Sequence, residues 1–428
     1  MSDFSQTSSR TYRQFEPGYV RTELLQRRYS GKVPWWREAV VNEVAGIIDV
    51  TGAKLLEDCV FFIARMGFTA LLFRPANLDI DTDSEPLRNL IAAAHRVGLK
   101  VMVRVCGANP DNSAAGEANS SHFYGFEKDF ATVVRRARIA LNCGADGIDL
   151  GRIEDISSHY GSLETEFTSL SRQLLVELTE YSEDHILGAS SSISQAGSYQ
   201  RYVEETWVHH LCDDGLQKVR FNAAEIEAAV REKISIHDKA GSVCTWRPAL
   251  LRLHHSLATV NFFPGSWEDG ADEARRASMR LQVAALPGAI YLPFGFSGGH
   301  FTFEGANIRP FPPQTELDKA RVAHTTMILR MRGQHHLATS AFGVVTNLPW
   351  ATRDCLVLSA GPIMSVLNTG SEPVYVPGEH ELLLRSDSTR QEDSPVARVL
   401  FAGEDLQVTH AGKEATEISP GTCAWFVS

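Results

Sequence analysis

Hydrophobic positions along most of the chain follow two alternating patterns. Short apolar segments, each the length of a buried strand, are followed by longer segments in which apolar residues recur every three or four positions, as on one face of a helix. The predicted strands cover 35–44, 68–73, 98–104, 148–150, 185–190, 207–212, 257–264 and 289–295. The predicted helices cover 54–66, 85–95, 133–141, 163–181, 223–234 and 317–331. This alternation predicts a (β/α)8 barrel over residues 35–336.

The pattern changes at about residue 337, where short alternating runs are separated by turn residues. The predicted strands there cover 342–346, 354–359, 364–368, 381–384, 399–402 and 422–427. They predict a C-terminal antiparallel β-sandwich domain over 337–428. Residues 1–34 are polar, and we expect an N-terminal arm that is either partly disordered or bound to a partner.

Composition narrows the classes of function. The 428 residues are 43% hydrophobic and 22% charged, as in ordinary globular proteins, and the net charge of −11 argues against nucleic-acid or anionic-membrane partners. We find no secretory signal and no apolar run near the roughly 20 residues that span a bilayer. We therefore expect a cytoplasmic protein that does not bind membranes.

Cysteine and histidine positions argue against a metal or cofactor. The seven cysteines are scattered without Cys-x-x-Cys spacing, which predicts reduced, mostly buried thiols and neither a zinc site nor a disulfide framework. Histidines occur as adjacent pairs at 209–210, 254–255 and 335–336, and adjacent side chains point apart. We therefore expect packing or surface roles for these pairs and no bound metal or cofactor.

Several motifs resemble the α-amylase family of glycoside hydrolases. Trp-Trp-Arg-Glu-Ala-Val-Val at 35–41 is similar to the first barrel strand of its α-glucosidase branch, and Leu-Pro-Gly at 286–288 to the approach to its eighth strand. Asp-Gly-Ile-Asp-Leu-Gly at 146–151 resembles the fourth-strand motif Asp-Gly-Phe-Arg-x-Asp. The resemblance implies a (β/α)8 barrel with a C-terminal β-sandwich. The short connection at 45–53 implies that the substrate-loop domain is truncated.

The residues that the resemblance assigns to catalysis are missing. In the family, the nucleophile, the general acid and a third carboxylate stand where this chain has Gly151, Ala189 and Trp267. Arg104 takes the place of a structural Asp, and Asn109 that of a sugar-contacting His. Retaining glycoside cleavage needs two carboxyl groups about 5–5.5 Å apart. We therefore expect a catalytically degenerate member, a pseudoenzyme.

Other residues are candidates for a rewired site. Asp149 alternates with Gly151 along the strand, so it points to the barrel axis, and Arg104 on the adjacent strand is its expected counter-ion. This is either a rewired acid–base pair or a buried ion pair that only fills space. Glu154 and Asp269, in loops, are further substitute carboxylates. The candidates for ligand binding are Arg104, Asn109, Asp149 and Trp267.

Two other side-chain groups are weaker candidates for a site. Ser190–Ser192 lacks the Gly-x-Ser-x-Gly elbow of a serine nucleophile. Aromatic residues could stack on a sugar or plug the barrel mouth; they are Trp35, Trp36, Phe262, Phe263 and Trp267.

Three hypotheses of function follow. The first is a non-catalytic subunit that binds and stabilises or activates a catalytically intact α-glucosidase-like paralogue. The second is an active glycoside hydrolase or transglycosidase on α-glucosides that uses relocated carboxylates. The third is a sensor that binds a saccharide without cleaving it.

Overall fold

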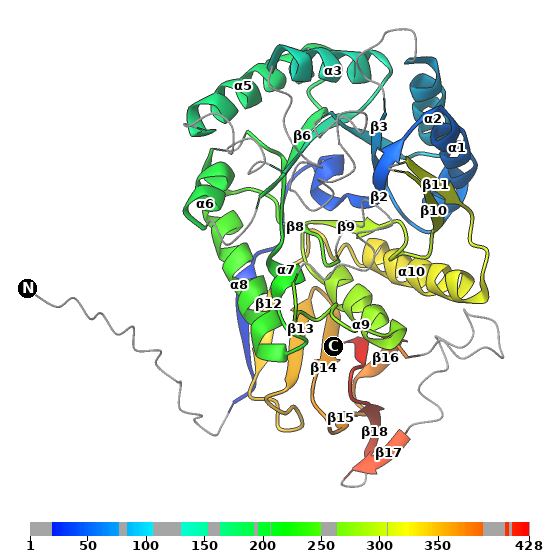
Figure 1. The fold of residues 1–428 in the computed structure, drawn as a ribbon. Helices are drawn as coiled ribbons and strands as arrows, with labels where there is room; N and C mark the ends of the chain where they lie inside the picture. Colours follow the sequence, from blue (N-terminus) through cyan, green and yellow to red (C-terminus); the bar gives the residue numbers. More distant parts are fainter. Residues whose placement is uncertain are drawn as a thin grey trace, which may run out of the picture.

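The structure, a computed structural model, consists of a helix-wrapped barrel above a smaller β domain (Figure 1). It describes residues 19–76, 84–105, 130–152, 163–191, 196–205, 207–249, 263–305, 307–387, 407–410 and 413–427. Within these residues no helix is both long and apolar enough to cross a membrane.

Eight parallel strands form the barrel. They are β2 (Val40–Ile48), β3 (Ala70–Pro75), β4 (Lys100–Arg104), β5 (Gly147–Arg152), β6 (Ile186–Ser191), β7 (His210–Asp213), β8 (Thr245–Trp246) and β9 (Ala289–Pro293). Each pairs with the next from β2 to β7, and β9 pairs with both β8 and β2. In the described chain β7 and β8 share no ladder, but the Thr245 hydroxyl donates a 2.6 Å hydrogen bond to the Leu211 carbonyl. The barrel is therefore nearly closed, as predicted.

Helices cover the outside of the barrel (Figure 1). They are α1 (Val50–Arg65), α2 (Ser84–Arg96), α3 (Phe130–Asn142), α5 (Leu163–Tyr181), α6 (Ala196–Glu204), α7 (Gly215–Lys218), α8 (Ala223–Ala240), α9 (Glu273–Ala284) and α10 (Glu316–Gln334). In α1, the residues Leu56, Cys59, Val60 and Ile63 recur at helical spacing and are buried, while the opposite face is exposed. A hairpin of β10 (His300–Glu304) and β11 (Asn307–Phe311) follows β9 and packs beside α1.

Strand alternation separates two apolar layers. Outward-facing residues such as Leu71 and Val101 pack against the helices in the main core. Inward-facing residues such as Val41, Met102 and Tyr291 form a second buried cluster inside the barrel. Side chains therefore fill the barrel interior, so that it is not a channel.

The C-terminal domain contains two antiparallel sheets. Its strands are β12 (Phe342–Thr346), β13 (Cys355–Ala360), β14 (Ile363–Asn368), β15 (Val374–Pro377), β16 (Glu381–Arg385), β17 (Gln407–His410), β18 (Lys413–Ile418) and β19 (Cys423–Val427). One sheet runs β1-β12-β13-β14-β19-β16 and the other β15-β18-β17. Val366 of the first sheet and Ile418 of the second share a buried apolar cluster. The predicted strand at 399–402 lies outside the described residues.

The N-terminal segment differs from the prediction. Strand β1 (Arg21–Gln26) pairs antiparallel with β12 at the edge of the C-terminal sheet, and Glu23 forms an ion pair with Arg231 of α8. An arm over 1–34 is therefore wrong for residues 21–26, because their backbone groups are part of this sheet. Residues 1–18 lie outside the described part.

Two strand assignments in the barrel are also wrong. Trp35–Glu38 forms a single 3₁₀ turn, η1, so the first strand begins at Val40 and not at residue 35. The seventh strand is β8, at Thr245–Trp246, and not 257–264. Most of the segment 257–264 lies outside the described residues. The first connection is even shorter than expected, since only Asp49 separates β2 from α1.

Candidate functional site

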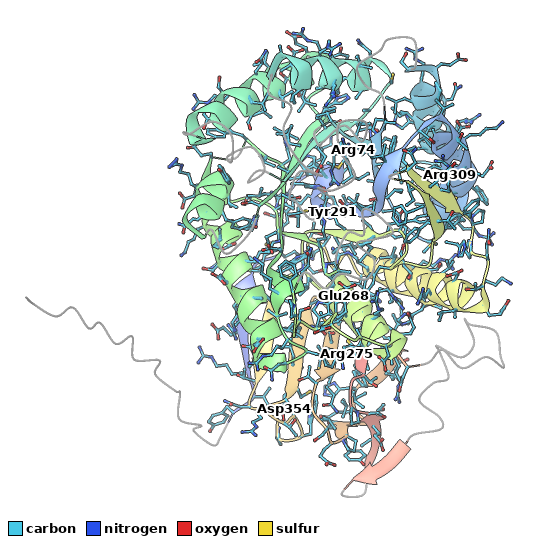
Figure 2. The ribbon with its side chains drawn as sticks, in the orientation of Figure 1. Arg74, Glu268, Arg275, Tyr291, Arg309 and Asp354 are labelled. Carbon is cyan, nitrogen blue, oxygen red and sulfur yellow. The ribbon has the colours of Figure 1, made fainter. Side chains whose placement is uncertain are left out.

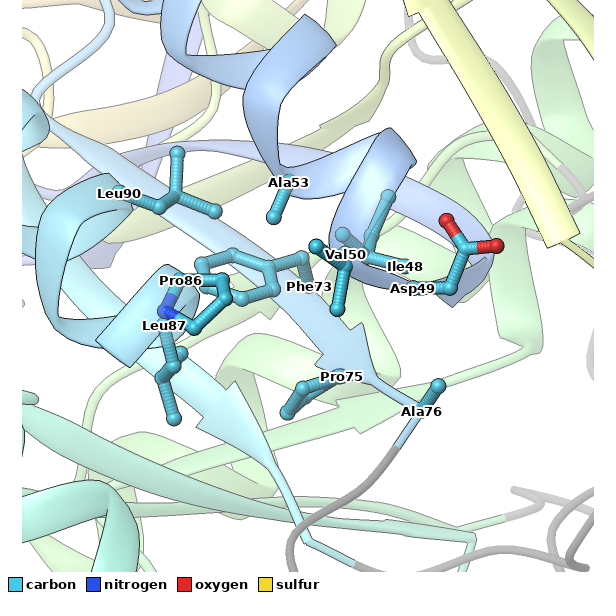
Figure 3. A pocket seen from close by; sticks show the side chains of 10 residues that line it. All are labelled: Ile48, Asp49, Val50, Ala53, Phe73, Pro75, Ala76, Pro86, Leu87 and Leu90. Atoms are coloured by element: carbon cyan, nitrogen blue, oxygen red, sulfur yellow. The ribbon is translucent and has the colours of Figure 1, made fainter. Parts of the chain in front are cut away.

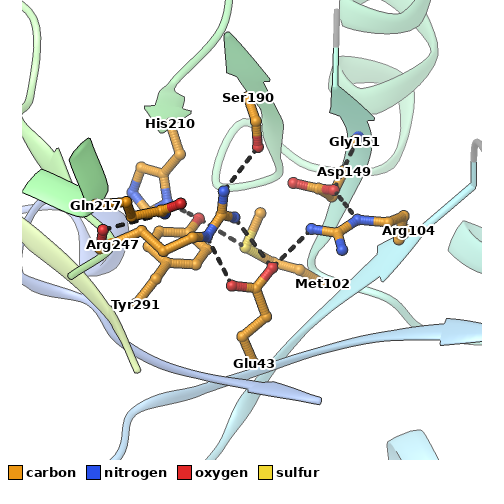
Figure 4. A network of polar contacts seen from close by, with 10 residues as sticks. All are labelled: Glu43, Met102, Arg104, Asp149, Gly151, Ser190, His210, Gln217, Arg247 and Tyr291. Atoms are coloured by element: carbon orange, nitrogen blue, oxygen red, sulfur yellow. Dashed lines mark hydrogen bonds and ion pairs between the residues drawn. The ribbon is translucent and has the colours of Figure 1, made fainter. Parts of the chain in front are cut away.

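A polar layer lies inside the barrel toward the carboxyl ends of its strands (Figure 4). Glu43 comes from β2, Arg104 from β4 and Asp149 from β5, while Ser190 comes from β6 and Arg247 directly follows β8. Barrel strands run parallel, so residues near their carboxyl ends converge at the end where barrel enzymes build their active sites. This layer is the candidate site.

Glu43 lies at the centre of the layer. Its Oε1 accepts hydrogen bonds from Arg104 Nη2 at 2.8 Å and from Arg247 Nη2 at 3.0 Å. Its Oε2 accepts from Arg247 Nε at 2.8 Å. Glu43 is completely buried. Two guanidinium groups therefore compensate one buried carboxylate, as burial of a charge requires.

Asp149 shares one of these arginines. Its Oδ1 accepts from Arg104 Nε at 2.5 Å and from the backbone N–H of Gly151 at 2.9 Å. Gly151 has a φ of +66°, in the left-handed region that favours glycine, and it lies at an irregularity in the β5–β6 pairing. The structure thus brings Arg104 and Asp149 together as the alternation of the strands predicts.

Arg247 joins the layer to the opposite side of the barrel. Its Nη1 donates to the Ser190 hydroxyl at 2.9 Å, and its guanidinium lies 5.4 Å from the ring centroid of Tyr291. Burial by itself lowers the pKa of Arg247, but the negative charges around it, including that of Glu43, outweigh burial and the net pKa is raised. Arg247 is therefore a permanent cation, and the two arginines balance the two carboxylates in charge.

A neutral layer lies beneath the polar one. His210 is buried between the Tyr291 hydroxyl, 2.6 Å from Nδ1, and the Trp36 carbonyl, 2.7 Å from Nε2. Burial lowers the pKa of His210 to about 4 and raises that of Tyr291 well above its ordinary value. Both side chains are therefore neutral at pH 7. Trp36 lies at the amino ends of the strands, where its ring contacts His209 and His210 edge-on.

The positions of His209, His210 and Trp36 can be compared with the roles predicted for them from the sequence. The pair His209–His210 has the packing role expected for it, since His209 Nδ1 accepts a hydrogen bond from the Leu187 N–H. Trp36 closes the amino-terminal end of the barrel, and a role for it at the mouth is wrong because it precedes β2 in the chain.

The positions aligned with the catalytic carboxylates fall in different places. Gly151 is the next-to-last residue of β5 and follows Asp149 by two residues. Ala189 packs in the outer core between strands and helices, so it does not face the barrel interior, and the inward residue beside it is Ser190. The residue of β6 that faces the polar layer is therefore Ser190, because a shift of one residue reverses the side a strand residue faces.

Trp267 and Asp269 lie outside the polar layer. Trp267 is completely buried, and its Nε1–H donates to the carbonyls of Leu216 and Pro248 at 2.9 and 3.2 Å. It does not end the seventh strand, and it is not an exposed stacking surface for a ligand. Asp269 accepts a 2.8 Å hydrogen bond from the Gly265 N–H in an exposed turn.

Asn109 and Glu154 lie outside the described residues. So do most of the connections that follow β4, β5, β6 and β8, at 106–129, 153–162, 192–195 and 250–262. The strands before these segments carry Arg104, Asp149 and Ser190, and Arg247 directly follows β8. The described chain holds no group of three or more His, Cys, Asp or Glu side chains placed to bind a metal ion.

A cavity of about 350 Å³ adjoins the carboxyl end of β9. Its lining includes the charged residues Glu268, Arg276, Asp318 and Arg321 and the polar His300, and Phe296 and Phe301 add aromatic surface. Figure 2 places Glu268 between the barrel and the C-terminal domain, below Tyr291. The volume lies in the range of small-molecule sites.

A second pocket lies between the start of α1 and the start of α2 (Figure 3). It is mostly apolar, with Phe73 and Leu87 among its walls, and its volume of about 70 Å³ is well below that of ordinary ligand sites. We assign it no ligand.

Sequence reasoning missed Glu43 and Arg247. Glu43 could have been recognised from the sequence, because it is the one charged residue in a mostly apolar strand and a buried charge must meet an opposite charge. Arg247 was missed because the two-residue strand before it was placed elsewhere in the chain.

The structure is similar to α-amylase-type enzymes of known structure. An Anoxybacillus α-amylase matches with a TM-score of 0.57 and 12% identity over 92% of this chain and 98% of that one. The Geobacillus thermoleovorans α-amylase, solved with acarbose, has the same TM-score and identity over 92% and 99%. The γ-CGTase of alkalophilic Bacillus clarkii has a TM-score of 0.58 at 12% identity over 92% and 71%.

Sequence comparison gives no relative. No family model matches the chain, and no curated protein matches it. At 12% identity the structural likeness establishes the fold alone: the chain has the barrel and C-terminal β domain of α-amylase-type glycoside hydrolases.

Proposed function

We propose that this protein is a non-catalytic counterpart of α-glucosidases, and that it acts as a subunit which binds and stabilises or activates an intact α-glucosidase-like paralogue. One observation is the main support for the proposed loss of catalysis. The two carboxylates of the polar layer, Glu43 and Asp149, each accept hydrogen bonds from arginine guanidinium groups.

The geometry of the layer supports this reading. A retaining glycosidase needs one carboxyl group that attacks the sugar and another that gives and takes a proton. Asp149 is about 1% exposed and Glu43 is not exposed. A sugar that reached either group would have to displace a guanidinium and leave a buried cation without its partner, which is costly. The polar layer therefore serves as a structural ion-pair network.

The partner role rests on what the chain retains. The barrel is nearly closed, and the C-terminal domain is packed against α8 and α9. A degenerate barrel that keeps its fold still offers an outer surface for another protein.

The described cysteines are all free, which supports a reducing compartment such as the cytoplasm.

The test combines activity with association. The chain is prepared alone and by co-expression with a paralogue that keeps the catalytic Asp and Glu. Both samples are separated by size exclusion with mass detection. Each fraction is then assayed for hydrolysis of maltose and p-nitrophenyl α-glucoside. We expect no turnover by the lone chain and a mixed complex that is more active or more stable than the paralogue. A paralogue lacking its nucleophile is the control, and it should leave the complex inactive.

Two results would reject the proposal. Turnover by the lone chain that disappears in Asp149→Asn, Glu154→Gln or Asp269→Asn would establish an active hydrolase with relocated carboxylates. Absence of any mixed complex would remove the subunit role.

The cavity beside β9 favours a second candidate, a saccharide-binding protein. Its lining combines hydrogen-bonding groups with the rings of Phe296 and Phe301, as sugar sites do. Calorimetric titration with maltose to maltohexaose tests it, and Phe301→Ala should weaken any binding. Binding without turnover and without a partner would favour this candidate over the first.

A further inference from the structure

A groove on the outside of the barrel lies between α1 and α10. Its volume is about 480 Å³. It is lined by the last turn of α1 and the middle of α10, through Phe62, Arg65, Met66, Val322, Ala323, Thr326, Met327 and Arg330. The groove is on the helical surface, remote from the polar layer inside the barrel.

Both helices are anchored to the rest of the fold. The side chain of Asp49, which caps the start of α1, accepts hydrogen bonds from Arg309 of the hairpin at 2.8 and 2.9 Å. At the end of α10, Arg332 is buried and donates to the carbonyls of Ala284 and Leu286, both at 2.7 Å. These contacts hold both helices in place, so the groove is a preformed feature.

The chemistry of the groove is unusual for an exposed surface. Most of its lining is apolar, whereas Arg65 and Arg330 are exposed. In the described part of the chain neither arginine forms a hydrogen bond or ion pair. Phe61 is 63% exposed and lies four residues before Arg65, on the same side of α1. An exposed apolar cleft flanked by uncompensated charges is typical of a protein-binding site.

We propose that this groove binds an amphipathic helix of the protein partner, one that presents apolar side chains to the groove and carboxylates to Arg65 and Arg330. This inference rests on the proposed subunit role, because it places the partner contact. Charge complementarity supports the choice of an acidic segment, because Arg65 and Arg330 are two exposed cations at the groove without a partner among the described residues. A helix laid between two helices buries its apolar face in the manner of helix-in-groove recognition.

The direct test uses synthetic peptides with the full-length chain. The probe is a fluorescein-labelled, 14-residue, helix-forming peptide with leucines one turn apart and flanking glutamates, read by fluorescence polarisation. Two matched peptides replace either the glutamates by lysine or the leucines by serine. We expect the acidic leucine peptide to bind about tenfold or more tightly than either of them, with affinity that falls as salt rises.

Variants locate the binding site. Arg65→Glu with Arg330→Glu reverses the charge of the groove, and Ala323→Trp fills it; both should reduce affinity about tenfold or more. The matched control is Arg96→Glu with Lys239→Glu, which changes net charge equally at exposed positions of other helices. Equal binding by the groove variants and the parent, or equal binding of the glutamate and lysine peptides, would overturn the proposal.

The same variants separate this inference from the proposed function. A paralogue complex that survives both groove variants overturns the groove and keeps the subunit role. Peptide binding that needs the groove, without any paralogue complex, keeps the groove and rejects the paralogue as partner. Self-association of the lone chain that Arg65→Glu/Arg330→Glu abolishes, or groove-dependent binding to phosphatidylserine vesicles without peptide selectivity, would assign the groove to another occupant and overturn the proposal.

Discussion

Buried charges at single residues define the interior of this barrel. Arg104 contacts both Asp149 and Glu43, so its removal affects two carboxylates at once. Relative to the family motifs that the sequence resembles, an arginine has replaced an aspartate on the third strand and an aspartate has replaced an arginine on the fourth. The order of the two charges is therefore reversed, and in this chain they form an ion pair between β4 and β5.

Arg104→Met is expected to lower the free energy of unfolding by about 3–5 kcal/mol, because it leaves Asp149 buried without a cation. Adding Asp149→Asn should recover much of that loss, since it removes the unpaired charge. Urea unfolding of the parent, both single variants and the double variant measures the coupling. Additive losses would show that the pair is not coupled.

His210 predicts a dependence of stability on pH. Its folded pKa of about 4 lies below the value of about 6.5 for an unfolded histidine. Between these values the unfolded chain binds a proton that the folded chain does not, so stability falls as the pH falls from about 6.5 to about 4.

The slope from one such residue is at most about 1.4 kcal/mol per pH unit. His210→Gln should remove this part of the slope when unfolding free energies are measured between pH 6.5 and 4.5. His209 and His324, whose pKa values burial lowers to about 4 and about 3, should preserve the rest. An unchanged slope in His210→Gln would contradict the assignment.

At the scale of elements, helix ends follow local sequence closely. The Thr315 hydroxyl accepts from the Asp318 N–H at 3.0 Å, and Asp318 Oδ2 accepts from the Thr315 N–H at 3.1 Å. This capping box begins α10 within one residue of the predicted start at 317. The residues that form such a cap lie within four positions of one another, so the local sequence is enough to predict where the helix begins.

Thr315→Ala should destabilise the protein by about 1 kcal/mol through loss of this cap. Thr315→Ser retains the hydroxyl and should cost much less. Chemical denaturation of the two variants and the parent gives the comparison. Equal losses in both would indicate that the methyl group of Thr315 matters, and not its hydrogen bond.

Strand β8 is an element that the hydrophobic pattern of the sequence does not predict. Its two residues are too short to produce an apolar run, and they are specified by parallel pairing with β9 and by the hydrogen bond from Thr245 to Leu211. Strand β1 fails for a similar reason, since its partner β12 lies more than 300 residues away in the chain. Long-range pairing has no local signature.

At the scale of the whole molecule, the barrel and the C-terminal domain share a buried polar interface. Gln282 of α9 accepts hydrogen bonds from the Ser365 hydroxyl at 3.0 Å and the Cys423 thiol at 3.4 Å. Ser278 of the same helix lies 2.9 Å from the Ser386 hydroxyl. These contacts couple the two domains.

Gln282→Leu should therefore lower the free energy of unfolding by about 1–3 kcal/mol, because it removes the buried oxygen that accepts hydrogen bonds from the Ser365 hydroxyl and the Cys423 thiol. Calorimetry should show one transition in the parent and the same single transition, at lower temperature, in the variant. Gln334→Leu, at an exposed position near the end of α10, is the control and should change little. Two separate transitions in the parent would contradict the coupling.

The sequence alone was sufficient to predict the barrel, the C-terminal β domain, most helices and the inward direction of Asp149. These follow from hydrophobic periodicity and short-range contacts, which the order of residues contains. Only the tertiary structure decided that Ala189 faces outward, that Trp267 is buried against the segments that follow β7 and β8, and that Glu43 and Arg247 complete the network. Each of these depends on register and on pairing between distant strands, where a shift of one residue changes the face that a side chain presents.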